Sequence, residues 1–204
     1  MKKMKEFRKI SVIGLGLIAS SICLTLRQKD PTIKLVGYDK DKVVRNRAKK
    51  IGLCKVESNL DNAVSGSQLI ILCVPVGQMQ AVTQRLKKII EPGTTITDVG
   101  SVKLSVIEEI ESNIESVGGK YVPSHPIAGT ERSGPDAGYA GLFEGRWCIL
   151  TPTKKTNKKA LNSLETFWKF LGMQTKIMTP EHHDLVLAVT SHAPHLIAYT
   201  MVGV

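Results

Sequence analysis

The stretch Ile10-Ser11-Val12-Ile13-Gly14-Leu15-Gly16-Leu17-Ile18-Ala19-Ser20-Ser21 decides the fold. A β-branched run leads directly into a glycine turn, and the turn opens an apolar, helix-like segment that reaches Leu26. Further along, Leu35-Val36-Gly37-Tyr38-Asp39 is typical of a second strand that ends in an acid. Strand, glycine turn, helix, strand and acid in this order form the dinucleotide-binding pattern of α/β proteins.

The small residues of this stretch each suit one part of a dinucleotide site. Gly14 permits the tight turn, and Gly16 has no Cβ, so a pyrophosphate can approach the backbone. Ala19 occupies the third small position, where helix and strand pack closely. The N–H groups at the start of the helix, at Leu17 and Ile18, favour an anion. A glycine turn between any buried strand and helix is the alternative, and the surrounding pattern favours dinucleotide binding.

The acid at the end of the second strand indicates which dinucleotide binds. Asp39 lies about twenty residues past the glycines, where a carboxylate can bond both ribose hydroxyls. The same carboxylate would repel a 2′-phosphate. The sequence therefore favours NAD over NADP.

Length and composition are those of a globular protein. The chain has 204 residues, which suggests one large domain, or one domain and part of another. No apolar run approaches the roughly twenty residues that span a bilayer. The basic N-terminus runs into a strand-length segment, so we expect no signal or transit peptide, no membrane partner and a cytoplasmic location.

The charge and the cysteines are typical of a protein with a lysine-rich, solvated surface and reduced thiols. The net charge is +10, and aromatic residues are only 5% and do not interleave with the basic clusters, so we expect no nucleic-acid partner. Solvated lysine-rich surface is the preferred interpretation, and its positive field would help gather anionic ligands. The four cysteines are scattered without a CxxC pair, which predicts reduced thiols and no metal site.

Strands alternate with helices through the first part of the chain. The apolar run Gln68–Pro75 suits a strand buried on both faces, and Thr94–Val99 is the next strand. Helices are expected at 42–51, 59–66, 76–90 and 103–116, followed by an extended segment at 121–123. This order predicts a Rossmann-type, doubly wound and mostly parallel sheet.

From Ser124 the sequence changes character. Residues 124–135 are rich in Gly, Pro and polar groups and are expected to form a loop that carries ligand chemistry. Strands are then expected at 147–150 and 174–178, with an amphipathic helix at 157–171 between them. A helix from Pro180 carries more apolar surface than a free terminus can expose. We therefore predict a cofactor domain over 1–178 and the first helix of an all-helical second domain over 179–204.

Together these stretches resemble the prephenate/arogenate dehydrogenase family of tyrosine biosynthesis. The resemblance runs from Val12 to the last residue and includes Cys73-Val74-Pro75-Val76 and Asp98-Val99-Gly100-Ser101-Val102-Lys103. Its most specific parts are Ser124-His125-Pro126-Ile127-Ala128-Gly129-Thr130-Glu131-Arg132-Ser133-Gly134 and Ser191-His192-Ala193-Pro194-His195. The resemblance implies NAD-linked oxidative decarboxylation of prephenate to 4-hydroxyphenylpyruvate, with Val74 and Pro75 joining the cofactor site.

The resemblance also implies two catalytic residues. His125 matches the family's catalytic histidine, and a neutral imidazole can accept the hydroxyl proton as hydride leaves. A loop histidine that only caps backbone is the alternative. Ser101 resembles the serine that orients this histidine and the substrate hydroxyl, at a strand end of the same sheet. Capping the helix that starts near Val102 is an alternative of nearly equal weight.

Substrate-binding residues follow in the same way. Thr130 and Glu131 resemble residues at the substrate mouth, although a surface ion pair explains Glu131 equally well. His195 resembles a histidine that reaches the substrate's anionic end. It is spaced i, i+3 from His192, which alone is a weak metal signal. His182 and His183 are expected to be structural or solvated.

Two departures from the family pattern bear on activity. Ala19 stands where family members usually carry Gly, which should weaken cofactor binding without abolishing it. Members continue into a helical domain that forms a homodimer and supplies a substrate-binding arginine, whereas no arginine follows Arg146 here. The alternatives are therefore an arogenate dehydrogenase, an NAD-binding chain with little turnover, or another Rossmann oxidoreductase such as a hydroxyacid dehydrogenase.

Overall fold

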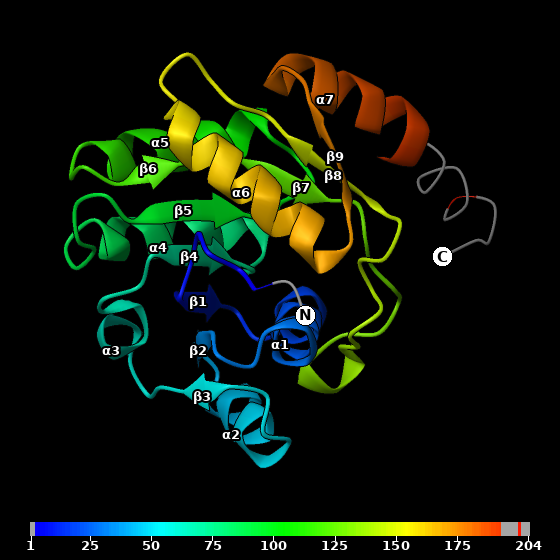
Figure 1. Ribbon diagram of the computed structural model, residues 1–204. Coiled ribbons are helices and arrows are strands. Elements are labelled where there is room, and N and C mark those ends of the chain that lie inside the picture. Colours follow the sequence, from blue (N-terminus) through cyan, green and yellow to red (C-terminus); the bar gives the residue numbers. More distant parts are fainter. Residues whose placement is uncertain (1–2, 193–199, 201–204) are drawn as a thin grey trace.

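The fold was analysed in a computed structural model that describes residues 3–192 and 200 (Figure 1). Its centre is a six-stranded sheet in which every neighbouring pair of strands is parallel. The spatial order is β3 (Lys55–Val56), β2 (Lys34–Tyr38), β1 (Lys9–Ile13), β4 (Leu69–Leu72), β5 (Thr95–Asp98) and β6 (Lys120–Tyr121). The order reverses between β1 and β4, which is where doubly wound proteins bind ligands. The predicted Rossmann-type sheet is confirmed.

Helices cover both faces of this sheet, as Figure 1 shows. They are α1 (Leu17–Lys29), α2 (Lys42–Lys50), α3 (Leu60–Val64), α4 (Met79–Leu86), α5 (Leu104–Glu115) and α6 (Lys158–Leu171). Helix α4 is shorter than the predicted 76–90 at both ends. A 3-10 turn at Val76–Gln78, which includes the weak helix former Gly77, precedes it, and residues 87–89 form a turn after it.

The core consists of two apolar clusters, one on each face of the sheet. In β4, Leu69 and Ile71 belong to the cluster that includes α1 and α6, whereas Ile70 and Leu72 belong to the cluster that includes α4 and α5. Successive strand residues point to opposite faces, so a strand covered on both sides must be apolar throughout. This explains the uninterrupted hydrophobic run in the sequence.

A second, three-stranded sheet was not predicted. It contains β7 (Ser124–Pro126), β8 (Trp147–Leu150) and β9 (Gln174–Ile177), with β7 antiparallel and β9 parallel to β8. The expectation that residues 124–135 form only a loop is therefore wrong for the first three. The strand β7 is short and its hydrogen-bonding partner β8 lies far along the chain, so local sequence gave no strand signal.

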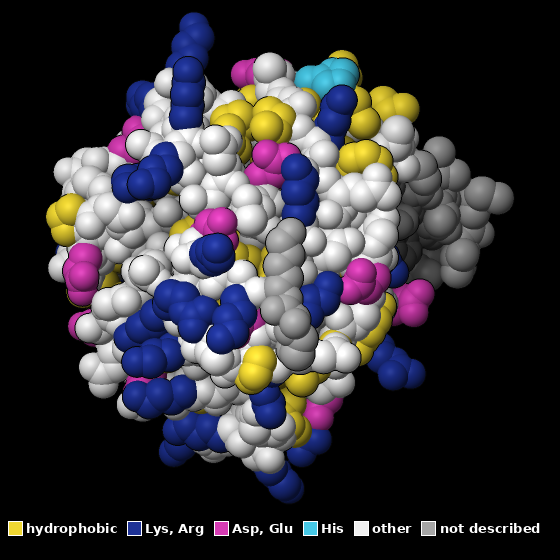
Figure 2. All heavy atoms as spheres, viewed as in Figure 1, with side chains coloured by type: hydrophobic (Ala, Val, Ile, Leu, Met, Phe, Trp, Pro, Cys, Tyr) yellow, Lys and Arg dark blue, Asp and Glu magenta, His cyan; other side chains and the backbone are white. Residues whose placement is uncertain are grey.

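The chain continues into α7 (Pro180–Leu187) and a π-helical turn (Ala188–His192). Helix α7 packs against α5. Leu185 of α7 and Val189 of the π-helical turn are exposed. Figure 2 shows hydrophobic side chains beside a histidine at the top of the face drawn there. The boundary at 178 remains a prediction. Among the described residues, no helix has the length and apolarity needed to span a bilayer.

Candidate active site

The glycine turn lies at the edge of a cleft of about 500 Å³, at the carboxyl end of β1. Gly14 has a φ of 90°, a conformation that favours glycine, and its N–H donates to the carbonyl of Tyr38 at 2.8 Å. A Cβ on Gly14 would lie 2.7 Å from the carbonyl oxygen of Cys73. A Cβ on Gly16 would meet no described heavy atom within 4 Å. The turn thus needs glycine at the first position and leaves open space at the second.

The start of α1 is suited to hold an anion. Gly16 is the N-cap and no described side chain caps this end, so the first-turn N–H groups have no side-chain acceptor there. Across the cleft, Asp39 accepts hydrogen bonds from the N–H groups of Leu15 at 2.8 Å and Asp41 at 2.9 Å. A cradle of backbone donors beside a fixed carboxylate fits the pyrophosphate and ribose of a dinucleotide.

Most of the predicted cofactor residues line this cleft. Those that do are Gly14, Gly16, Asp39, Val74 and Pro75. Leu17 and Ile18 lie in the first turn of α1 but are not among the residues that line the cleft. Gln78 and Gly134 line it as well, and sequence analysis named neither for this role. Gly134 comes from the segment that follows β7, which therefore reaches the cofactor cleft.

That segment is fastened across α1 and α2. The single Nε–H of Arg47 is shared between the two carboxylate oxygens of Asp136, at 2.9 and 2.8 Å, and its Nη2 also pairs with Oδ1. The N–H of Tyr139 donates to the hydroxyl of Ser21 at 3.1 Å, and a Cβ on Gly138 would lie 2.9 Å from the backbone of Ser20. The close approach requires glycine. These contacts connect the second sheet with the cofactor cleft.

His125 lies on β7, and only 8% of its surface is exposed. Its Nδ1 lies 2.9 Å from the Nε2 of His183, and the Nδ1 of His183 lies 2.7 Å from Oδ1 of Asp184. The two rings meet edge to face, with centroids 5.1 Å apart. Three titratable side chains thus form one hydrogen-bonded row, from β7 into α7.

The protonation states along this row follow from its surroundings. Burial lowers the pKa of His183 below 6.5, and hydrogen bonding and charge from Asp184 oppose this only in part. Burial acts to raise the pKa of Asp184, but the backbone N–H groups of Leu104 and Lys103 and the ring of His183 outweigh it and lower the pKa. At neutral pH the row therefore contains a neutral His183 and an ionised Asp184.

A buried ionic cluster underlies the row. Lys103 and Asp98 form an ion pair with fully buried side chains. The ammonium also donates to the carbonyl of Ser124 at 2.9 Å, and the hydroxyl of Tyr121 donates to Asp98 at 2.7 Å. The hydroxyl of Ser124 donates to the carbonyl of Asp98 at 2.8 Å. These bonds fix the residue that precedes His125 to the end of β5.

The register of the sheet relates this cluster to the glycine turn. Ile13 pairs with Leu72, and Leu72 pairs with Asp98, so Ile13 and Asp98 lie two strands apart at one edge. Neighbouring strands are about 4.8 Å apart, which places the two residues about 10 Å from each other. Gly14 follows Ile13, and His125 is fixed to Asp98 through Ser124. His125, the candidate proton acceptor, and the glycine turn therefore lie at the same edge of the six-stranded sheet, where its strands end.

The other predicted residues are less enclosed. Ser101 is exposed and follows β5 in the six-stranded sheet, so it does not share a sheet with His125 as expected. Nor does its side chain cap α5. The carboxylate of Asp184 accepts from the N–H groups at the helix start, 2.8 Å from Lys103 and 2.9 Å from Leu104. Helix α7 thus supplies the cap that Ser101 was expected to provide.

Thr130 and Glu131 are exposed residues of the segment that follows β7. The hydroxyl of Thr130 accepts from the N–H of Arg132 at 3.2 Å. His195 lies outside the described residues. Substrate binding by these three residues remains a prediction.

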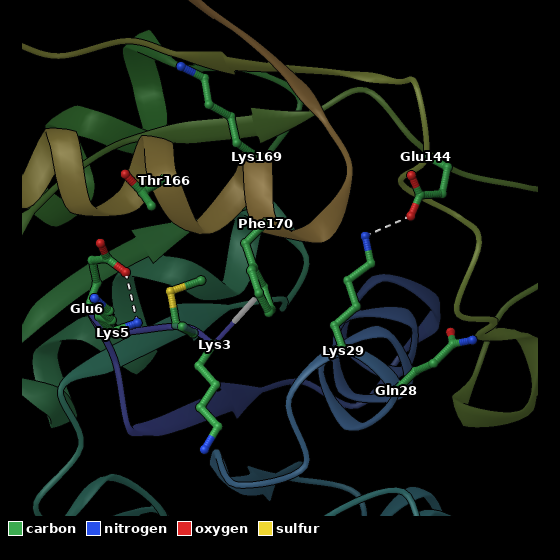
Figure 3. A pocket seen from close by; sticks show the side chains of 10 residues that line it. Lys3, Lys5, Glu6, Gln28, Lys29, Glu144, Thr166, Lys169 and Phe170 are labelled. Carbon is green, nitrogen blue, oxygen red and sulfur yellow. Dashed lines mark hydrogen bonds and ion pairs between the residues drawn. The ribbon is translucent and has the colours of Figure 1, made fainter. Parts of the chain in front are cut away.

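A larger cavity, of about 1000 Å³, lies between the N-terminal segment, α1 and α6 (Figure 3). It is lined by several lysines and Phe170, and one of the lysines, Lys29, pairs with Glu144 at 2.8 Å. None of the predicted site residues lines it. The chemistry therefore points to the smaller cleft at the glycine turn.

Sequence analysis missed the residues that support His125. His183 was expected to be structural or solvated; it is fully buried, and its hydrogen bond to His125 was not predicted. Asp98 and Lys103 stood in a stretch quoted for the family resemblance without a role. An acid and a lysine five positions apart at the end of one strand could have indicated this ion pair. Nothing local indicated that His183 would meet a histidine on a distant strand.

Comparison with known proteins extends this description. The model of the family described as prephenate dehydrogenase, nucleotide-binding domain, matches residues 22–177. A cyclohexadienyl dehydrogenase of Zymomonas mobilis is 41% identical over 201 residues, which cover 98% of this chain and 68% of the relative. The prephenate dehydrogenase of Bacillus subtilis is 34% identical, and the match covers 99% of this chain but 54% of the relative.

Solved structures agree. Prephenate dehydrogenase from A. aeolicus, in complex with hydroxyphenyl propionate and NAD+, superposes with a TM-score of 0.88 at 32% identity, covering 96% of this chain and 68% of that one. Synechocystis arogenate dehydrogenase gives a TM-score of 0.85 at 28% identity, covering 95% and 68%. The chain therefore belongs to the prephenate dehydrogenase family and contains its nucleotide-binding domain.

Proposed function

We propose that this chain is the cofactor-binding and proton-accepting part of an NAD-dependent prephenate dehydrogenase of tyrosine biosynthesis. The observation that carries the proposal is that the glycine turn and a buried histidine, which is fixed through Ser124 to the end of β5, lie at the same edge of the six-stranded sheet. The relatives support it, because their names include prephenate dehydrogenase and one solved relative binds NAD+.

Different residues of the cleft would bind different parts of the cofactor. The N–H groups at the start of α1 would hold the pyrophosphate, and Asp39 would hold the ribose hydroxyls. Asp39 can keep its hydrogen bond from the N–H of Leu15 while it binds the ribose, since each carboxylate oxygen can accept more than one hydrogen bond. When bound, NAD supplies the acceptor for the hydride.

His125 would accept the proton of the substrate hydroxyl as hydride leaves the same ring carbon. The ring carboxylate then departs as carbon dioxide, its electron pair completes the aromatic ring, and the product is 4-hydroxyphenylpyruvate. The proton ends on the imidazole. Burial of His125 keeps water from competing for this position.

Prephenate and arogenate differ only in a keto or amino group on the side chain. We place prephenate first because the family model and the Bacillus relative carry that name, and arogenate second because the Synechocystis structure is an arogenate dehydrogenase. The chemistry at His125 is the same for both. The choice between them rests on residues that contact the side chain, for which Thr130, Glu131 and His195 are the candidates.

The test follows NADH absorbance with each substrate. We expect NADH from the wild type with prephenate, a loss of at least a hundredfold in His125→Asn, and an unchanged rate in His182→Gln, whose histidine is exposed on α7. Equal rates in the wild type and His125→Asn would refute the catalytic role. Calorimetry with NAD runs in parallel, and NAD binding without turnover would identify the chain as a binding domain that needs a helical domain to react.

A further inference from the structure

We propose that His183 and Asp184 are positioning residues that fix the tautomer of His125, with the proton on Nδ1 and the acceptor lone pair on Nε2. This inference rests on the proposed function for its meaning, because a general base must present an unprotonated nitrogen to the substrate. It extends that function by giving two side chains of α7 a role in positioning the general base.

The argument begins at Asp184, whose orientation is fixed. Oδ1 accepts from the N–H of Lys103 at 2.8 Å, and Oδ2 accepts from the N–H of Leu104 at 2.9 Å. Both donors lie at the start of α5, where the helix dipole stabilises a negative charge. An ionised carboxylate only accepts hydrogen bonds. The Nδ1 of His183, 2.7 Å from Oδ1, must therefore carry the hydrogen.

The tautomer of His183 then determines the tautomer of His125. A neutral imidazole has one N–H and one acceptor nitrogen, so a proton on Nδ1 of His183 leaves its Nε2 as an acceptor. That Nε2 lies 2.9 Å from the Nδ1 of His125, which must donate. The proton of a neutral His125 is thereby held on Nδ1. Its Nε2 becomes the nitrogen that can take a proton.

The charged and titratable groups around the row keep His183 neutral. Asp184 lies beside it on α7, and Asp98 and Lys103 approach from the end of β5 and the start of α5. Cys148, on β8, pairs with Pro126, the residue that follows His125. The positive Lys103 and burial both oppose a second proton on His183. A protonated His183 would present two donors and reverse the direction of the bond to His125.

The row would also stabilise the product of proton transfer. Once Nε2 of His125 takes the substrate proton, Nδ1 keeps its hydrogen and continues to donate to His183. The negative charge of Asp184 then lies one ring away from the imidazolium. Serine proteases use a buried aspartate in a related way, to set the tautomer of the catalytic histidine. Here a second histidine stands between the carboxylate and the base.

The test reads the tautomer directly, by NMR of the full chain labelled with 15N-histidine. His125→Gln identifies the signals of His125, and His182→Gln is the matched control on the same helix. In the wild type we expect His125 with a protonated Nδ1 and an unprotonated Nε2. In His183→Leu the acceptor for the Nδ1 hydrogen is lost, so we expect the proton on Nε2, the form that a neutral imidazole prefers in water. In His183→Gln the amide oxygen can accept from His125, so the wild-type tautomer should return.

A proton on Nε2 of His125 in the wild type, or the same tautomer in all three proteins, would overturn the proposal. The measurement needs no substrate, so equal rates of NADH formation in the wild type and His125→Asn would refute the proposed function and leave the tautomer result intact. Backbone amide spectra show whether each variant is folded, and His183→Gln keeps the test decisive if His183→Leu is not. In turnover, His183→Leu should lower kcat at least tenfold with little change in the Kd for NAD.

Discussion

Replacing Gly14 with alanine tests the physical basis of the cofactor turn. The new methyl would lie 2.7 Å from the carbonyl oxygen and 2.8 Å from the carbonyl carbon of Cys73, on backbone with a φ of 90°. Strained backbone costs about 1–3 kcal/mol, and overpacking costs about 1–3 kcal/mol more. A loss of about 3 kcal/mol lowers the Tm of a domain of this size by about 6–12 °C. Differential scanning calorimetry measures it.

Gly16→Ala is the matched control, because a methyl there meets no described heavy atom within 4 Å. We expect its Tm to fall by no more than about 4 °C, since alanine is a poorer N-cap than glycine by under about 1 kcal/mol. Its methyl would occupy the space where the pyrophosphate must approach, so the Kd for NAD should rise at least tenfold. The reasoning is refuted if Gly14→Ala melts with the wild type, or if Gly16→Ala binds NAD as well as the wild type does.

Three further changes probe the groups around the site. Lys103→Met leaves the carboxylate of Asp98 buried without its cation, and urea unfolding should show a loss of about 3–5 kcal/mol, part of which Asp98→Asn in the same chain restores. Asp39→Ala removes the ribose acceptor, so calorimetry should show a Kd for NAD about tenfold higher, with NADP affected less. The folded pKa of His183 lies below 6.5, so the unfolded chain binds more protons as pH falls below that value and stability is lost there. The fall in Tm between pH 7 and pH 5 should therefore be smaller in His183→Gln, and an identical fall would show that His183 does not contribute.

The six-stranded sheet was predictable because its signals are local. The glycine turn after β1 needs a positive φ, and β4 is apolar throughout because both of its faces are covered. Each of these requirements is visible within a window of a few residues. The alternation of strands with helices predicted the doubly wound, mostly parallel sheet, whereas the order of the strands came from the structure.

The second sheet and the row of titratable residues were not predictable in this way. Three residues of β7, one of them Pro126, carry no periodic signal, and the strand exists because β8 pairs with it. The place of His125 was inferred from resemblance, whereas the bond to His183 depends on how α7 packs against α5. A contact set by the docking of two distant elements leaves no pattern in either segment.

Asp184 explains why the position of α7 matters to chemistry at β7. Its carboxylate caps α5 through two backbone N–H groups, and the same Oδ1 that bonds Lys103 also faces the ring of His183. The helix start thus determines which way the carboxylate points, and the carboxylate determines which nitrogen of His183 carries the proton. Because only five residues separate the end of β5 from the start of α5, the same short connection holds the buried ion pair beneath β7. A displacement of α7 by even one hydrogen-bond length would remove the cap and the tautomer control together, so the stability of α5 and the tautomer of His125 should change in step.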